Sequence, residues 1–184
     1  MIRVLLAAGL ALTLVGAHGP AAHYLTGPDG LILPDGVITP GATVSGITKS
    51  DVCQPGYAAG VRAVTEARKV RACLLYGQYD CPGKHFEIDH LVSLELGGSN
   101  DLTNLWPQPI DQARMKDKLE NYLHREVCGG TITLEHAQQA ISTDWASAYH
   151  EMEKPAHVPA WEREDFPSVL FSPRGYNPFS GLAP

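Results

Sequence analysis

The stretch of residues 86–106 constrains this chain more than any other part of it. It begins with alternating apolar residues, continues into an acid beside an imidazole at Asp89 and His90, and passes through a Gly-Gly pair to Asn104. Alternation of this kind predicts a strand, and a glycine pair predicts a turn. We therefore expect a strand, a loop and a second short strand, with Asp89 and His90 on the first strand.

A helix is predicted after this stretch, from Asp111 to Val127, and a Gly-Gly pair ends it. Its apolar residues recur at helical spacing and form the expected core face: Met115, Leu119, Tyr122 and Leu123. Asp117 and Glu120 are three residues apart and so share one face of the helix. Asn121 and His124 continue that face.

An acid and a histidine on a strand, together with acids on a helix, are what a metal-dependent phosphodiesterase needs. A neutral imidazole near its ordinary pKa of about 6.5 can accept a proton from water, which is the role we expect for His90. Neighbours on a strand point to opposite sides, so Asp89 and His90 need either a local bend or separate roles. Separate roles fit well, and we expect Asp89 to bind the metal. Asp117 and Glu120 are the expected helix ligands, and hard carboxylates favour Mg²⁺ or Mn²⁺.

Three further residues are expected at this site. Asn104 is placed to hydrogen-bond across the Gly-Gly loop and to hold the backbone or ring of His90, while Arg114 and Lys116 are the nearest candidates for substrate phosphate contacts. Each residue also has an ordinary interpretation, since Asp-His dipeptides occur by chance and helix acids commonly line a solvated face. The order of the whole set favours the functional interpretation.

Two more helices are predicted on either side of this region. Thr65 can cap a helix that runs to about Tyr76, and Thr133 can cap a last helix from Leu134 to about Met152. Their expected apolar faces are Ala67, Val70 and Leu74 in the first helix, and Ala137, Ala140, Ile141 and Trp145 in the last. Nearer the N-terminus, turn signals separate two short apolar runs, 31–33 and 37–38, which could be strands or extended wrapping.

The N-terminus is typical of a secretory signal. Arg3 precedes an apolar run from Val4 to Gly16, and small residues allow cleavage after Ala17. An uncleaved anchor is the alternative interpretation, although the run is short for a stable membrane span. We expect an exported protein, secreted or in the periplasm or cell envelope, with no stable membrane association after cleavage. The net charge of −6 argues against non-specific coating of nucleic acid, but it allows a locally basic groove.

Four cysteines, Cys53, Cys73, Cys81 and Cys128, are an even number in a chain expected to be exported. Export favours disulfides, and without a CxxC pair a structural zinc site is the weaker interpretation. Three pairings are possible. We expect Cys53–Cys128, which ties the two flanks of residues 86–106 together, and Cys73–Cys81, which closes a short loop.

The chain is therefore divided into four parts: a signal peptide at 1–17, an extended segment at 18–45, the main domain at 46–150, and a proline-rich tail at 151–184. The tail has no hydrophobic period, and prolines interrupt it throughout. It also contains five aromatic residues, Trp161, Phe166, Phe171, Tyr176 and Phe179, so we hypothesise that part of it docks on the domain.

Short motifs spread from Ile38 to Trp145 carry a resemblance to a known family. They are Cys53-Gln54-Pro55-Gly56-Tyr57, Val61-Arg62, Glu87-Ile88-Asp89-His90, Leu94-Glu95-Leu96-Gly97-Gly98, Asn104-Leu105-Trp106-Pro107, Lys116-Asp117, Glu120-Asn121 and Val127-Cys128. Together they resemble the HNH endonucleases, also called His-Me finger or ββα-metal endonucleases. The likeness is greatest to a group of short exported bacterial proteins of HNH type.

The resemblance implies roles for several residues. His90 would be the general base, Asp89 a metal ligand, and Asn104 the residue that orders the loop of the finger. Where many members place His or Asn on the helix, this chain offers Ala113 and Asp117. Asp117, with Glu120 or Asn121, is therefore the inferred replacement. The resemblance also implies that Cys53 and Cys128 occur together.

These observations predict an α+β fold: a small domain built round a ββα-metal finger, with flanking helices and irregular termini. The expected function is that of a secreted, metal-dependent endonuclease that cuts DNA, and RNA as a further substrate, with low sequence specificity. One alternative is a non-catalytic, disulfide-stapled binding or structural domain that retains the finger. Another is a phosphodiesterase that acts on nucleotides or other small phosphates. No zinc finger, helix-turn-helix or long basic arm in the sequence predicts selective reading of bases.

Overall fold

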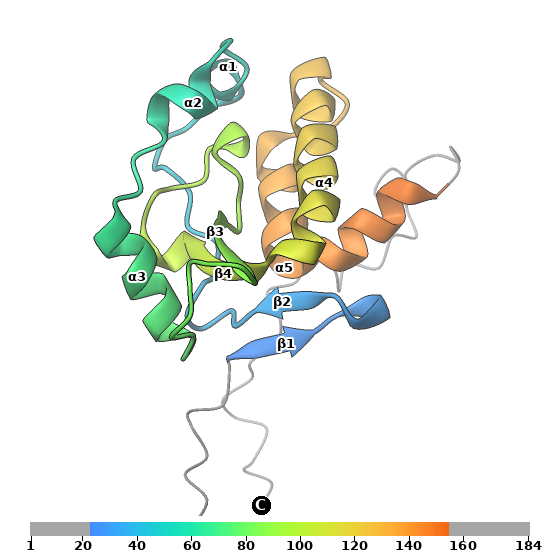
Figure 1. Cartoon of the computed structure of the whole chain (residues 1–184). Coiled ribbons are helices and arrows are strands. Elements are labelled where there is room, and N and C mark those ends of the chain that lie inside the picture. Colours follow the sequence, from blue (N-terminus) through green and yellow to red (C-terminus); the bar gives the residue numbers. More distant parts are fainter. Residues whose placement is uncertain (1–22, 155–184) are drawn as a thin grey trace, which may run out of the picture.

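A computed structural model describes residues 23–154 of the chain (Figure 1). Within this range the fold is mixed α+β, with two small antiparallel sheets and five α-helices. The strands are β1 (Tyr24–Thr26), β2 (Ile32–Pro34), β3 (Phe86–His90) and β4 (Leu105–Pro109), and the helices are α1 (Lys49–Val52), α2 (Tyr57–Val61), α3 (Glu66–Leu75), α4 (Ile110–Gly129) and α5 (Leu134–Glu153). The expected signal peptide lies outside the described residues, as do the tail's aromatic residues.

Strands β3 and β4 confirm the strand–loop–strand prediction. They pair antiparallel, with Asp89 opposite Trp106 and His90 opposite Leu105. The loop that joins them closes tightly at Gly98. A Cβ at Gly98 would lie 1.8 Å from the carbonyl oxygen of Val92, so only glycine fits there. The loop therefore returns the chain to β4 directly beside β3.

Helices α4 and α5 confirm the two long helix predictions and pack against each other (Figure 1). Helix α4 also contacts β4, and α5 contacts β2. Leu119 and Leu123 of α4 are fully buried, as are Ile141 and Trp145 of α5. Met115 and Tyr122 are partly buried and pack against the same core. The sequence did not predict the bend in α5 at Asp144, where the backbone angles are non-helical. The core thus forms between the helix pair, the N-terminal residues Leu31 and Leu33, and the segment that follows β3 and leads into β4.

Helix α3 begins after Thr65, whose hydroxyl accepts a hydrogen bond from the amide of Arg68, as expected of an N-cap. Its predicted apolar face was wrong: Val70 and Leu74 are each 47% exposed, and Ala67 is exposed as well. The buried face instead consists of Ala72, Cys73 and Tyr76. The reason is tertiary, because a disulfide at Cys73 and a buried hydrogen bond from Tyr76 Oη to Thr39 hold that face inward.

The N-terminal hairpin resolves the open question about residues 31–38. Strand β2 covers 32–34 and pairs with β1, whereas residues 37–38 form part of a turn. Leu33 is buried in the core, and Trp145 donates a hydrogen bond from its indole to the carbonyl of Ile32. The hairpin thereby covers the bend in α5.

Both predicted disulfides are present, Cys53–Cys128 and Cys73–Cys81. The first joins the end of α1 to α4 across a sequence separation of 75, and the second closes a separation of 8. Such bonds persist in oxidising compartments, so the two disulfides indicate an oxidising environment for the protein. Among residues 23–154, no helix is both long enough and apolar enough to cross a membrane.

Candidate functional site

Asp89 and His90 end β3 and, as strand neighbours, face different partners. Oδ2 of Asp89 accepts a hydrogen bond from the indole nitrogen of Trp106 at 2.9 Å and lies 2.7 Å from the Nζ of Lys116. The second carboxylate oxygen of Asp89 has no hydrogen bond from the described residues, and the side chain is 15% exposed. One oxygen of Asp89 is thus held by the protein from two sides, by Trp106 and by Lys116.

Lys116 lies at the centre of the site and is fully buried. Its Nζ donates to the carbonyl oxygen of His90 at 2.8 Å and pairs with the carboxylates of Asp89 and Glu120. Burial disfavours its charge, but the two carboxylates more than offset this and raise the pKa of Lys116. The prediction that Lys116 contacts substrate phosphate is therefore corrected, because its ammonium is enclosed among protein oxygens.

Glu120 is likewise held by Lys116, from the next turn of α4. Burial raises the pKa of Glu120, and the neighbouring ammonium acts in the opposite direction. Its role here is to balance the charge of Lys116. The structure thus separates the two helix acids that the sequence placed together, because Glu120 faces inward and Asp117 is exposed.

The His90 ring is 5% exposed, and its Nε2 lies 3.1 Å from Oδ1 of Asn100. The orientation of the Asn100 amide follows from two backbone contacts: its Nδ2 donates to the carbonyl of Val61, and its Oδ1 accepts from the amide of Ala63. Because Oδ1 only accepts, Nε2 of His90 must carry the proton. The lone pair of the neutral ring then lies on Nδ1.

Burial also lowers the pKa of His90, since a charged imidazolium is poorly solvated there. The hydrogen bond that the ring donates to Asn100 and the charge of Asp89 oppose this shift, while the charges of Arg62 and Lys116 add to it. At neutral pH the ring is therefore uncharged, with Nδ1 available to accept a proton. This is the state that a general base requires.

Asn104 orders the loop, but it does so without touching His90. Its side-chain amide donates to the carbonyls of Val92 and Ser99 and accepts from the amide of Val92, each at 2.9 Å. The prediction that Asn104 bridges the Gly-Gly loop agrees with these contacts. The residue that holds the ring of His90 is Asn100, which the sequence reasoning missed.

An acidic cluster, Glu87, Asp89 and Asp117, surrounds the outer side of the site. Burial raises the pKa of Glu87 and of Asp117, and the charge of Asp89 raises both further. The cluster therefore holds more negative charge than Lys116 neutralises. Hard carboxylate oxygens in excess are a donor set that suits Mg²⁺ or Mn²⁺. Among the described residues, however, no three ligand atoms of these acids converge closely enough to mark a metal site, so metal binding by Asp89, Asp117 and Glu120 remains a prediction.

A second group of metal-ligating atoms lies at the Cys53–Cys128 disulfide. The ligand atoms of Cys53, His124 and Cys128 lie within 4.8 Å of one another, and Glu95 Oε2 is 3.8 Å from His124 Nδ1. Three such residues could hold a soft metal. Metals bind the thiolate, however, so in the disulfide state only His124 remains as a strong ligand.

Arg114 and Asn121 are exposed on α4, where either can meet solvent or substrate. Arg114 makes no ion pair within residues 23–154, and its phosphate contact remains a prediction. Asn121 donates from its side chain to the carbonyl of Asp117 and so stabilises its own helix. The resemblance implies that Asn121 is an alternative metal ligand, which remains a prediction.

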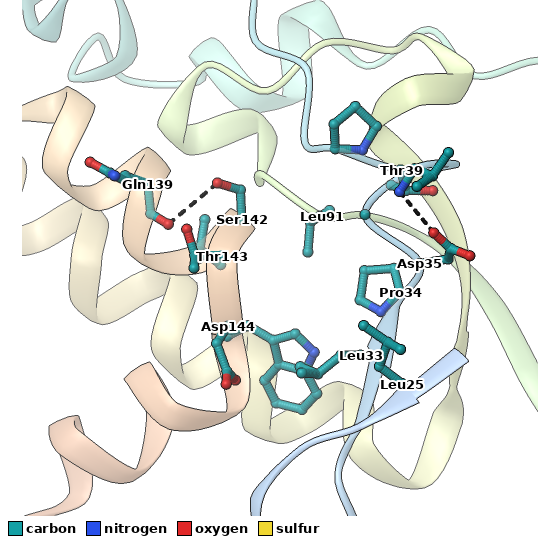
Figure 2. A pocket seen from close by; sticks show the side chains of 15 residues that line it. Leu25, Leu33, Pro34, Asp35, Thr39, Leu91, Gln139, Ser142, Thr143 and Asp144 are labelled. Carbon is teal, nitrogen blue, oxygen red and sulfur yellow. Dashed lines mark hydrogen bonds between the residues drawn. The ribbon is translucent and has the colours of Figure 1, made fainter. Parts of the chain in front are cut away.

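A pocket of about 670 Å³ lies on another part of the protein, between the β1–β2 hairpin, the following turn and α5 (Figure 2). Its lining is largely apolar and includes Leu25, Leu33 and Leu91. Its two acids are already engaged, since Asp35 accepts from the amide of Val37 and Asp144 accepts from Ser147. The pocket therefore has space for a ligand but no free acidic group, whereas the candidate catalytic residues lie around His90.

Comparisons of the chain with protein-family models, with curated proteins and with solved structures find no match.

Proposed function

We propose that the protein is a metal-dependent endonuclease of the HNH type, which hydrolyses phosphodiester bonds in DNA. The observation that carries this proposal is the state of His90: a buried, neutral imidazole whose tautomer is set by Asn100, one residue from a carboxylate in an acidic cluster. The order of β3, loop, β4 and α4 also supports an HNH-type finger. RNA is a further candidate substrate.

The proposed chemistry is attack by water on phosphorus. Nδ1 of His90 accepts a proton from the water, the new P–O bond forms, and the bond from phosphorus to the 3′ oxygen breaks. Asp89 and Asp117 would hold a divalent cation, which when bound supplies Lewis-acid stabilisation of negative charge on the reacting oxygens. Lys116 and Trp106 hold Oδ2 of Asp89, and this fixes the orientation of the whole carboxylate. Asn104 keeps the loop closed beneath the strand.

The proposed location is outside the cytoplasm, secreted or in the cell envelope. Residues 1–17 would direct export, and the two disulfides fit the oxidising compartment that export provides.

A non-catalytic scaffold is the second candidate, and Lys116 is the observation that favours it. Its ammonium lies among Asp89, Glu120 and the carbonyl of His90, where it neutralises acids that the sequence had assigned to a metal. In that case the finger would be held by an internal ion pair and would need no cation.

Incubation of the purified protein with plasmid DNA and Mg²⁺ or Mn²⁺ distinguishes the two candidates. The nuclease predicts nicking and linearisation that EDTA abolishes and added metal restores. His90→Ala should reduce cleavage by about a hundredfold or more, the usual contribution of a general base. Intact plasmid with every divalent cation tested would favour the scaffold. Full metal-dependent cleavage by His90→Ala would instead overturn the assignment of His90 as the general base.

A further inference from the structure

Asn100 connects the His90 ring to the segment of residues 61–65. Its Nδ2 donates to the carbonyl of Val61 at 2.8 Å, and its Oδ1 accepts from the amide of Ala63 at 3.2 Å. Its backbone carbonyl accepts from the guanidinium of Arg68 at 2.8 Å. The same Oδ1 contacts His90. One side chain therefore fixes the residues on both sides of position 62 beside the candidate base.

Arg62 occupies that position. Helix α2 ends at Val61, and Arg62 has extended backbone angles, so the segment passes the site as an extended chain. The guanidinium is exposed and forms no ion pair with any described residue. By contrast, Lys116 is enclosed, Lys69 pairs with Glu66, and Arg68 is engaged by Asn100. Arg62 is thus a cation with unpaired donors on the segment that Asn100 holds, and its charge acts on His90.

A positive charge near His90 would also offset the negative charge of the acids around it when a polyanionic substrate binds. The acidic cluster of Glu87, Asp89 and Asp117 would repel a polyanion, and a single divalent ion compensates only part of that charge. A guanidinium presents a planar fork of donors that matches two phosphate oxygens, and it stays charged at all working pH values. Its charge also contributes to the neutral state of His90.

We propose that Arg62, presented at His90 by the Asn100 amide, binds a backbone phosphate of the nucleic acid substrate. The inference rests on the proposed nuclease function and deepens it: the ligand is a phosphodiester of a polynucleotide, recognised by charge and shape rather than by base identity. Arg62 takes the role that the sequence had given to Lys116. Asn100 is a positioning residue in this scheme, because it acts through Arg62 and His90.

The direct test measures binding of a short fluorescein-labelled duplex DNA by anisotropy, in EDTA so that it is not cleaved. Arg62→Ala should raise the Kd about fivefold or more, and the slope of log K against log salt should fall by about 0.9, the value for one phosphate contact. Arg71→Ala is the matched control. It removes an exposed arginine from α3 that has no contact with Asn100, and it should leave both quantities close to those of the native protein.

Asn100→Ala tests the positioning step. Releasing residues 61–65 should weaken DNA binding nearly as much as Arg62→Ala does, and the double variant should be little worse than either single one. In Mg²⁺, Arg62→Ala should raise KM more than it lowers kcat, and Arg62→Lys should recover part of the loss. Additive effects in the double variant would show that Asn100 does not act through Arg62.

The outcomes separate this inference from the proposed function. If the native protein cleaves DNA, but Arg62→Ala has unchanged Kd, salt slope and KM, the inference is overturned and the nuclease stands. Equal losses in Arg62→Ala and Arg71→Ala would also overturn it, since they would reflect general charge alone. If the native protein neither binds nor cleaves DNA, both proposals are overturned together.

Discussion

The Nζ of Lys116 lies 2.7 Å from Oδ2 of Asp89, so the lysine ammonium forms an ion pair with the carboxylate at the centre of the site. The same ammonium donates to the carbonyl of His90. A single helical side chain therefore fixes the end of β3 that carries both residues. Lys116 also pairs with Glu120, whereas Asp117 is exposed and forms no ion pair with it. Asp117 is therefore the helix acid that we expect to be available to a cation.

Replacing Lys116 with methionine should destabilise the fold by about 3 kcal/mol, since two buried carboxylates would lose their counter-charge. The matched variant Lys116→Met/Glu120→Leu removes one of those carboxylates as well and should recover much of this loss. Urea unfolding measures both free energies. Nuclease activity should stay low in the double variant, because Asp89 is no longer oriented. Native stability and activity in Lys116→Met would contradict this account.

Asp117 is the helix residue that we expect to bind the cation. Asp117→Asn removes one carboxylate charge from the acidic cluster and should weaken Mg²⁺ or Mn²⁺ binding by about tenfold, as measured by titration calorimetry. Asp111→Asn removes an equal charge from another exposed position of α4 and serves as the control. Equal affinities for metal in Asp117→Asn and the native protein would remove Asp117 from the ligand set.

Much of the framework follows from local sequence signals. Some features depend only on residues close together in the chain, and the structure confirms their prediction. They are the hydrophobic period of α4 and α5, the caps at Thr65 and Thr133, and the Gly-Gly loop. The face of α3 was mispredicted because its burial depends on partners distant in the sequence, above all the contact of Tyr76 with Thr39. Hydrophobic period alone does not contain that information.

The site was predictable to the same extent. Asp89, His90 and Asn104 could be selected from their order along β3, the loop and β4. Lys116 could not be assigned, because a lysine beside an aspartate on a helix normally faces solvent, and only the packing of α4 against β3 buries it. Asn100 is separated from Val61 by 39 residues, so its contact there leaves no local trace. The one available signal was its place in the loop beside the Gly-Gly pair.

The two disulfides should differ in their contribution to stability. In the chain-entropy description, a bond contributes more when it closes a longer loop: about 4.5 kcal/mol for a separation of 75, against about 2.5 kcal/mol for a separation of 8. Cys53→Ala/Cys128→Ala should therefore lower the unfolding free energy more than Cys73→Ala/Cys81→Ala. Urea unfolding of the two variants provides matched controls, and the reverse order would show that loop closure is not the dominant effect.

The pH dependence of cleavage tests the state of His90. A base must be unprotonated, so kcat/KM should fall as the pH drops through the pKa of His90, and this limb should lie below about 6.5 because burial lowers the pKa. Asn100→Ala removes a hydrogen bond that favours the charged ring, so the limb should move to still lower pH while the plateau falls. Ring ¹⁵N shifts supply a readout independent of activity: the native ring should be protonated on Nε2, and Asn100→Ala should show a mixture of tautomers. A native ring protonated on Nδ1 would contradict the assignment of Nδ1 as the base.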